Sequence, residues 1–292
     1  MNHYMKNNNI QIGRLYIVAT PIGNYSDISQ RALNTLKKVN FILAEDTRKT
    51  GLLLNYFHIK KKLYSYYEYN EKKNTTKFLE KINKGYNVAL VSDAGTPLIN
   101  DPGYRMIKLC REKYLNIRII SIPGPCSAIV ALSISGLPTN RFCYEGFLSN
   151  KKSKRIKRLY ELKSEYRTII LYESTHRLLK CLYDIKNIFG KKRYIVIARE
   201  LTKKWENIHG DYISNLIKWI KLDLNQIKGE IVLIISGYKK SNNIKDKISS
   251  KIKKTFFSLK KELALKKAIN ITANIYSIKK NLLYKFYLKN KD

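Results

Sequence analysis

The sequence predicts an α/β protein whose first half holds a mainly parallel sheet covered by helices. Two observations lead to this prediction. Strand-like and helical segments alternate along residues 14–125, and loops rich in small residues follow several of the strand-like segments. After residue 125 the pattern changes but still mixes strands and helices, and a stretch rich in Lys, Asn and Ser near residue 240 precedes a short helical tail. We therefore expect an α/β protein with a small helical domain at its C-terminal end.

In the first half, each expected strand is a short apolar run, and each expected helix carries apolar residues at a helical period. The helix at 29–39 places Leu33 and Leu36 near one face, and the helix at 75–85 ends at Gly85. The expected strands are 14–20, 41–46, 62–70, 87–93 and 117–125. The expected helices are 29–39, 47–57, 75–85 and 103–114.

The second half begins with a helix of small residues at 126–136, and a basic helix that contains KKSKRIKR follows at 151–164. Apolar runs and helical periods then continue to alternate. The expected strands are 167–174, 192–202 and 229–237, and the expected helices between them are 175–190 and 214–223.

The tail is expected to form a small helical domain over residues 256–292, after a linker at 241–255. It holds two helical patterns. The residues expected to form its core are Leu263, Leu265, Ile269, Ile275, Leu282 and Phe286. Four lysines of the tail are expected either to contact the phosphates of a nucleic acid or only to face solvent: Lys266, Lys267, Lys279 and Lys280.

Composition narrows the function. The net charge of +35 favours a polyanionic partner such as nucleic acid, although a genome rich in A and T would also enrich Lys, Asn, Ile and Tyr. No apolar run approaches the roughly 18 residues of a membrane span, and MNHYMKNNNI lacks the apolar core of a signal peptide. The four cysteines and four histidines show no metal-ligand spacing. We expect a cytoplasmic protein with reduced cysteines, no metal and no membrane association.

Three common nucleotide-binding or hydrolase motifs are missing from the sequence: G-x-G-x-x-G after the first strand, G-x-x-x-x-G-K-[ST], and G-x-S-x-G. Small-residue loops instead follow three strands, at 19–24, 92–97 and 123–128. In open α/β sheets, ligands bind at the carboxyl ends of strands, where small residues let a ligand approach backbone groups. The three loops are therefore expected to share one ligand-binding edge, unless they are only tight turns.

A series of motifs carries a resemblance to a known family. In order they are LYIVATPIGN, AEDTRKTGLLL, NEKKN, ALVSDAGTPLINDPGY, IPGPCSAIVAL, GLPTNRFCYEGFL, YESTHRL, ARELTKKWE and KGEIVLI. The chain resembles the tetrapyrrole-methylase-like superfamily of S-adenosylmethionine-dependent methyltransferases, and within it the subfamily that acts on small-subunit ribosomal RNA. The resemblance covers residues 14–240, and the tail is also similar to that subfamily's C-terminal domain.

The resemblance implies two α/β lobes, 14–123 and 124–240, with the cofactor S-adenosylmethionine in the cleft between them. It implies a homodimer and a substrate of small-subunit (16S) ribosomal RNA or the 30S subunit. The implied reaction methylates the ribose 2′-hydroxyl of a cytidine in the decoding region. The first loop reads Thr-Pro-Ile-Gly-Asn (20–24), where many superfamily members have G-x-G-x-P. This departure speaks against one alternative, a methylase of a small acidic macrocycle. A second alternative, an RNA-binding protein that has lost its catalysis, stays open.

The resemblance also implies site residues. The residues carried over as cofactor contacts are Pro21, Asp93, Ala94, Gly95, Thr96, Cys126, Ser127, Tyr172 and Ala198. A general base would help a ribose hydroxyl to react. The candidate catalytic residues are Glu45, Asp46, Arg48, Glu173 and Glu200, with His176 as a further candidate base. Each acid is alternatively a structural partner of Arg48, Arg177 or Arg199, whereas Arg48, Arg199 and Lys203 are candidates to hold phosphates.

Overall fold

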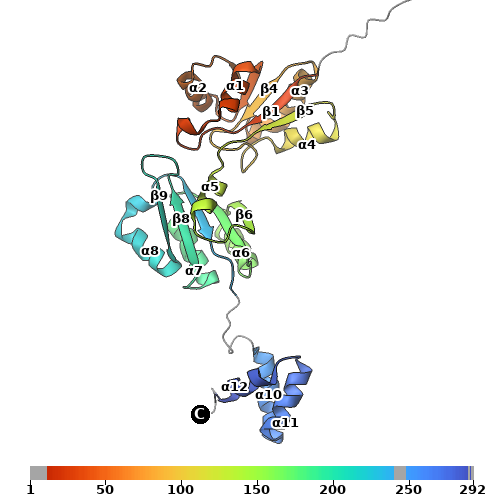
Figure 1. Ribbon diagram of the computed structural model, residues 1–292, viewed down its shortest axis with the longest axis vertical. Coiled ribbons are helices and arrows are strands. Elements are labelled where there is room, and N and C mark those ends of the chain that lie inside the picture. Colours follow the sequence, from red (N-terminus) through yellow and green to blue (C-terminus); the bar gives the residue numbers. More distant parts are fainter. Residues whose placement is uncertain (1–11, 240–247, 289, 291–292) are drawn as a thin grey trace, which may run out of the picture. The chain divides into compact units, whose positions relative to one another are not determined.

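The computed structural model describes residues 12–239, 248–288 and 290. The chain divides into two compact units, Met1–Gly237 and Tyr238–Asp292. The first unit contains two five-stranded sheets, and the second is helical (Figure 1). The segment MNHYMKNNNI and residues 241–247 of the expected linker lie outside the described residues. The predicted fold class, α/β with a helical C-terminal region, is confirmed.

The first sheet has the strand order β3-β2-β4-β1-β5, and every pairing in it is parallel. Its strands are β1 (Arg14–Val18), β2 (Phe41–Ala44), β3 (Lys62–Ser65), β4 (Val88–Val91) and β5 (Arg118–Ile122). Since all five strands run the same way, their carboxyl ends meet at one edge. The loops that follow β1, β2, β4 and β5 start at this edge.

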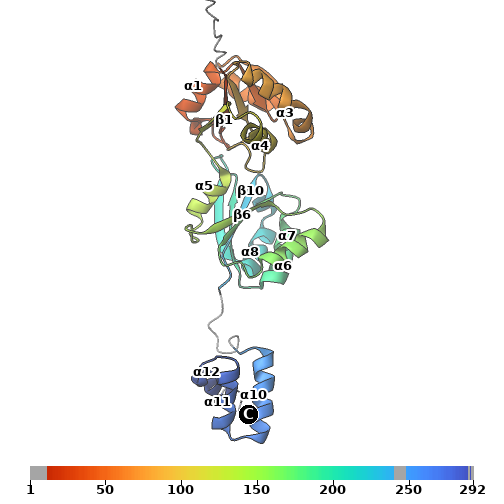
Figure 2. The ribbon, with the colours of Figure 1, turned by 90° about the vertical axis from the view of Figure 1, so that its right-hand side faces the viewer.

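Helices cover both faces of the first sheet (Figure 2). They are α1 (Gln30–Lys38), α2 (Thr47–Tyr56), α3 (Glu68–Asn83) and α4 (Tyr104–Glu112), with a short 3-10 helix η1 at Tyr25–Asp27. Alternation along β1 decides which residues face which helices. Leu15 joins the core beneath α3 and α4, whereas Val18 joins the core beneath α1 and α2. The first half is therefore a three-layer structure, as its strand–helix alternation predicts.

The second sheet has the order β6-β7-β10-β8-β9 and is mixed: only the β6–β7 pairing is parallel. Its strands are β6 (Phe142–Phe147), β7 (Thr168–Glu173), β8 (Tyr194–Arg199), β9 (Asn207–Tyr212) and β10 (Ile231–Ile235). The sequence does not predict β9. Its NIHGDY is mostly polar because it is an edge strand without a fully buried residue.

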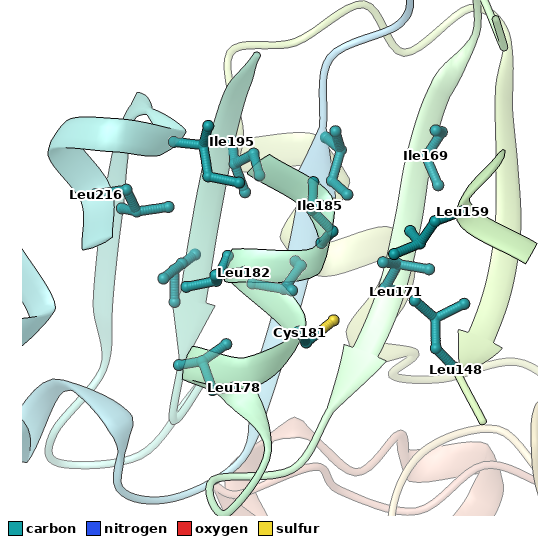
Figure 3. Close-up of a cluster of buried hydrophobic side chains, with 14 of the residues drawn as sticks. Leu148, Leu159, Ile169, Leu171, Leu178, Cys181, Leu182, Ile185, Ile195 and Leu216 are labelled. Carbon is teal, nitrogen blue, oxygen red and sulfur yellow. The ribbon is translucent and has the colours of Figure 1, made fainter. Parts of the chain in front are cut away.

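Three helices pack on one face of the second sheet and one on the other. They are α6 (Lys152–Leu162), α7 (Leu178–Phe189) and α8 (Ile213–Leu222) on the first face, with η2 at Leu224–Ile227, and α5 (Ser127–Ile134) on the second. Figure 3 shows the larger core, where Leu182 and Ile185 of α7 lie among Leu171 of β7 and Ile195 of β8. On the opposite face, Ala128, Ala131 and Leu132 of α5 pack together with Ile22 and Leu201.

The chain passes from one sheet to the other at residues 123–126. β5 ends at Ile122, and α5 packs against β7 and β10. The lobe boundary expected at 123/124 falls in this passage. It remains a prediction, because both lobes belong to one compact unit, Met1–Gly237.

The C-terminal unit consists of α10 (Ser250–Glu262), α11 (Leu265–Ile275) and α12 (Lys280–Leu288). The linker predicted at 241–255 is therefore wrong from residue 250, where Ser249 caps a helix by accepting a hydrogen bond from the Ile252 N–H. The sequence of α10 is rich in lysine, and its buried residues are only Ile252 and Phe256. It therefore shows no clear apolar period from which the helix could be predicted. The predicted core is right for Ile269 and Phe286 but wrong for Ile275, which is 59% exposed.

Several simple features complete the described part of the chain. All four cysteines are free. Among the described residues, no helix has the length and apolar character needed to span a membrane. The same residues hold no group of three or more His, Cys, Asp or Glu side chains suited to a metal ion.

The basic segment 151–158 contains one arginine that is buried in the core and one that forms ion pairs at the surface. Arg155 turns inward, where its guanidinium contacts the Asp184 carboxylate of α7 at 2.8 Å and donates hydrogen bonds to two backbone carbonyls. Both side chains are almost fully buried. Arg158 pairs with Glu145 and Glu161 at the surface. These two arginines are therefore occupied by acidic partners.

We predict that Asp184→Ala destabilises the first unit by about 3–5 kcal/mol, because it leaves the Arg155 charge buried without its partner. Chemical denaturation of the full chain measures the free energy of unfolding. Glu161→Ala is the matched control on a half-exposed pair, where the expected loss is below about 1 kcal/mol. Equal losses in the two variants would contradict the distinction.

Candidate active site

A cavity of about 390 Å³ lies in the first unit and is lined by residues of both lobes. Cavities of this size are typical of small-molecule sites. The first lobe contributes the loops after β1 and β4. The second lobe contributes the start of α5, the carboxyl ends of β6, β7 and β8, and the start of β10. The lining residues are Ile22, Ala94, Asn100, Asp101, Ser127, Phe147, Tyr172, Glu173, Ser174, Thr175, Ala198, Leu201, Gly229, Glu230, Ile231 and Val232.

A second hollow of about 300 Å³ adjoins this cavity and shares Ile22, Ala94 and Glu230 with it. The shared residues make the two hollows neighbouring parts of one cleft. The second hollow is lined mostly by the first lobe. Its other residues are Thr20, Pro21, Gly23, Tyr25, Lys49, Thr50, Leu52, Leu53, Ser92 and Asp93.

The loops after β1 and β4 are joined backbone to backbone. The Thr20 N–H donates to the Gly95 carbonyl at 2.9 Å, and the Gly95 N–H donates back to the Thr20 carbonyl at 3.0 Å. The Thr20 hydroxyl also donates to the Ser92 carbonyl at 3.2 Å. Gly95 has φ +83°, a conformation that favours glycine. These bonds explain why small and turn-forming residues occur in both loops.

The loop after β4 also contacts the second lobe. The Thr96 hydroxyl donates to the Pro125 carbonyl at 2.9 Å. Further along, Asn100 has φ +71° and packs against Gly146, where a β-bulge interrupts β6. A Cβ on Gly146 would lie 2.5 Å from the Asn100 side-chain oxygen, so this close approach requires glycine. The sequence SDAGTPLINDPG thus links the lobes beside the cavity.

On the second lobe, the Ser127 and Tyr172 hydroxyls share a hydrogen bond of 2.7 Å beside the cavity. The Tyr144 ring packs edge-on against Tyr172, and burial raises the pKa of its hydroxyl. The Tyr144 hydroxyl is buried and makes no hydrogen bond among the described residues. A buried polar group without a partner is costly, which suits a site where a ligand or water supplies one.

Acidic residues concentrate on the first-lobe side. The Asp93 carboxylate accepts hydrogen bonds from the Asp46 N–H at 2.9 Å and from the Lys49 ammonium at 2.8 Å. The Glu45 carboxylate accepts the Asp93 N–H at 3.2 Å, and burial raises its pKa. Asp101 also lies nearby, and its burial, reinforced by the charge of Glu45, raises the pKa of its carboxyl to about 7.

The other candidate acids are held by basic residues. Asp46 caps α2 and pairs with Arg48 at 2.7 Å, and this hydrogen bond lowers the pKa of the Asp46 carboxyl. Glu173 pairs with Arg177 at 2.8 Å. Glu200 pairs with Lys203 at 3.0 Å, whereas the sequence favours Arg199 as its partner. The structural alternative raised for these acids therefore has direct support.

Not all the residues expected at the site line the cleft. Those that do are Pro21, Asp93, Ala94, Ser127, Tyr172, Glu173 and Ala198. Gly95 and Thr96 shape the loop, and Cys126 packs against the core beneath α5. The candidates outside the lining of the cavity and its neighbour are Glu45, Asp46, Arg48, Glu200 and His176. His176 lines a different hollow with Leu179 and Leu224.

Sequence reasoning misses four prominent lining residues: Asn100, Asp101, Phe147 and Glu230. Asn100 and Asp101 follow the loop expected at 92–97 and stand in a run of turn-forming residues, which gives them no separate signal. Phe147 and Glu230 lie within quoted motifs, yet the motifs do not say which side chains face the cleft. Asp101 lies ten residues beyond the end of β4 and outside the loop expected at 92–97, so no local pattern in the sequence marks it as a lining residue.

Comparison with known proteins gives consistent results. The family model for Tetrapyrrole (Corrin/Porphyrin) Methylases matches residues 14–216. The protein of Escherichia coli O157:H7 named ribosomal RNA small subunit methyltransferase I is 51% identical over 277 residues, 95% of each chain. The protein of the same name from Buchnera aphidicola subsp. Schizaphis graminum is 52% identical over 281 residues, 96% of this chain and 97% of its own.

Solved structures share the fold at low sequence identity. Uroporphyrin-III-C-methyltransferase from Thermus thermophilus has a TM-score of 0.55 at 18% identity and covers 77% of this chain and 94% of its own. Diphthine synthase has a TM-score of 0.58 at 16% identity and covers 78% of this chain and 92% of its own. The matched family model and the nearly full-length relatives agree. The chain therefore belongs to the tetrapyrrole (corrin/porphyrin) methylase family and, within it, to the group of ribosomal RNA small subunit methyltransferase I proteins.

Proposed function

We propose that this protein transfers a methyl group from S-adenosylmethionine to small-subunit ribosomal RNA, at the ribose 2′-hydroxyl of a cytidine in the decoding region. The observation that carries the proposal is the similarity to relatives of that name over 95% of both chains. It extends past residue 216, where the family model ends, into the helical tail. A ribosomal substrate implies a cytoplasmic location, which is part of this proposal. The homodimer implied by the resemblance stays a prediction.

The cavity fits an S-adenosyl cofactor. Its volume suits a ligand of that size, Ala94 and Ala198 leave room near the backbone, and Ile231 and Val232 offer apolar contact. The buried Tyr144 hydroxyl lacks a partner that a polar ligand would provide. The cofactor supplies an activated methyl group when it is bound. Ala94, Ser127, Tyr172 and Ala198 are the residues proposed to hold it, as the resemblance implies.

The neighbouring hollow suits the RNA. Its rim carries exposed aromatic and apolar side chains on the first lobe, where Tyr25 packs edge-on against Tyr56 with ring centroids 4.8 Å apart. Tyr56 is 61% exposed and Leu52 is 65% exposed. Lys49 lines the same hollow, and the Arg48 side chain is 88% exposed. Aromatic rings beside cations match the stacking and charge that single-stranded RNA offers.

In this arrangement the chain catalyses the reaction mainly by positioning. The walls of the cavity hold one reactant, and the first-lobe rim orients the other. Bringing two reactants into line can contribute roughly 7–11 kcal/mol to lowering a barrier. The Thr96–Pro125 hydrogen bond and the Asn100–Gly146 contact keep the two walls in register.

Purified small subunits that lack the modification are expected to gain one labelled methyl group on a cytidine ribose when incubated with this protein and labelled S-adenosylmethionine. Nuclease digestion maps the label. Asp93→Ala should lower the rate by roughly one to two orders of magnitude, because it removes charge-assisted bonds worth about 1.5–3 kcal/mol that fix the loop after β4. Glu112→Ala, on the exposed surface of α4, is the control. Label absent from the subunits would contradict the proposed function.

Tyr56→Ala is expected to raise KM for the small subunit at least fivefold, since one lost stacking contact costs roughly 1–3 kcal/mol. Binding of S-adenosylhomocysteine, measured by calorimetry, should not change. Tyr160→Ala on α6 removes a similarly exposed tyrosine away from the cleft and serves as the control. If both variants behave alike, the rim does not contact RNA.

Replacing Lys266, Lys267, Lys279 and Lys280 by Gln is expected to weaken RNA binding and to flatten its salt dependence. All four side chains are exposed on the helical unit. Each lost phosphate contact should reduce the slope of log K against log salt by roughly 0.7–0.9. Fluorescence titration at several salt concentrations measures the slope. An unchanged slope would mean that these lysines only face solvent.

A further inference from the structure

The carboxylates around the cleft differ in their partners. Asp46, Asp93, Glu173, Glu200 and Glu230 each lie within 3.1 Å of a Lys or Arg nitrogen. Such a partner stabilises the ionised form and makes a carboxylate a weak proton acceptor. These five acids are therefore already engaged with cations of the chain itself.

Asp101 differs from all five. It lines the cavity, and among the described residues no Lys or Arg forms an ion pair with it. The charged groups that act on it are the carboxylates of Glu45, after β2, and Asp93, after β4. The Ser92 hydroxyl is a polar neighbour and donates to the Ala94 and Gly95 carbonyls. From β6, the Tyr144 hydroxyl faces the same region and is influenced by the Asp101 charge.

The backbone around Asp101 is tightly specified. Leu98 and Asn100 both adopt positive φ, and Gly103 at φ +129° packs so closely against Leu90 that a Cβ would collide with it. Asn100 is held against the bulge at Gly146. Strained backbone of this kind persists where surrounding structure enforces it and often marks functional loops. The carboxyl group is therefore held in a fixed position at the cavity wall.

We propose that Asp101 is the proton acceptor for the ribose hydroxyl that is methylated. This inference rests on the proposed function. As the hydroxyl oxygen forms its bond to the methyl carbon, Asp101 takes the hydroxyl proton, and the carbon–sulfur bond breaks with its electron pair passing to the sulfonium sulfur. The protonated Asp101 then releases its proton to water as the product leaves. Charge and atoms balance without any further reactant.

The remaining acid without an ion pair, Glu45, suits this role less well. It does not line the cavity, and its carboxylate accepts the backbone N–H of Asp93. Its negative charge instead acts on Asp101. Glu45 is thus a positioning residue that raises the proton affinity of its neighbour.

The pH dependence follows from these surroundings. The pKa of Asp101 is raised to about 7 by burial and by the nearby carboxylates, so the ionised form is the one that the fold disfavours. The rate should rise with pH through this value and then level off. Ionised Asp101 also costs folding stability as pH rises from its unfolded pKa toward its folded one. Asp101→Asn should therefore unfold at no lower temperature than the wild type above neutral pH.

The test compares the wild type, Asp101→Asn, Asp101→Glu and the surface control Glu112→Gln from about pH 5.5 to about pH 8.5, bracketing the expected catalytic pKa. We expect Asp101→Asn to lose roughly 10²–10⁴ of kcat and the rising limb of the pH profile. S-adenosylhomocysteine should bind with unchanged affinity. Asp101→Glu should keep part of the activity with a shifted limb, and Glu112→Gln should match the wild type.

A readout independent of RNA is the ¹³C carboxyl resonance of labelled aspartate. One resonance should titrate near neutral pH in the wild type and vanish in Asp101→Asn. The inference is wrong if Asp101→Asn is active and keeps the wild-type pH profile. It is also wrong if Asp101→Asn binds S-adenosylhomocysteine more weakly and the wild type shows no aspartate resonance that titrates near neutral pH. A wild type that methylates no subunit would contradict the proposed function instead. Should Asp101→Asn fail to fold, the Asp101→Glu profile and the wild-type resonance decide.

Discussion

The paired hydrogen bonds between Thr20 and Gly95 are the constraint on which the site depends. They join the loops after β1 and β4 across the carboxyl edge of a parallel sheet. A bridge of this kind needs residues that can turn sharply, and Gly95 at φ +83° meets that need. The same loop carries Thr96, whose hydroxyl donates a hydrogen bond to the Pro125 carbonyl at the start of the second lobe. The cavity wall therefore depends on these few hydrogen bonds, together with the packing of Ile22 against the second lobe.

Charge is distributed unevenly around this wall. Basic residues neutralise most of the acids near the cleft, so the net charge of +35 is not uniformly available to a polyanion. Arg155 and Arg158 show the same effect within a basic segment. The cations that do reach the rim, such as Arg48 and Lys49, also hold the acids beside them. Composition gives the net charge but does not show where unpaired cations lie or which acids lack a cationic partner.

The sequence predicts the first sheet well because its strands are buried on both faces and appear as short apolar runs, such as Val88–Val91. It misses β9 because an exposed edge strand needs no such run. It misses the start of α10 because lysines outnumber the apolar residues there. The motifs indicate which loops meet in the cleft. They do not indicate that Asp101 and Glu230 line the cavity, because this depends on tertiary contacts that no local pattern encodes. Arg177, four residues from Glu173, is the partner that the sequence suggests, whereas Glu200 pairs with Lys203 and not with the expected Arg199.

Both sheets of the first unit are open, with β3 and β5 at the ends of one and β6 and β9 at the ends of the other. An open edge invites strands of other molecules to pair with it, and charged side chains discourage such pairing. β3 begins with the exposed Lys62, directly after two further lysines, and β5 begins with the exposed Arg118. Basic side chains at the starts of these two edge strands are therefore expected to discourage pairing with other molecules. A lineage whose codons drift toward lysine would gain solubility at these edges even where no nucleic acid is bound.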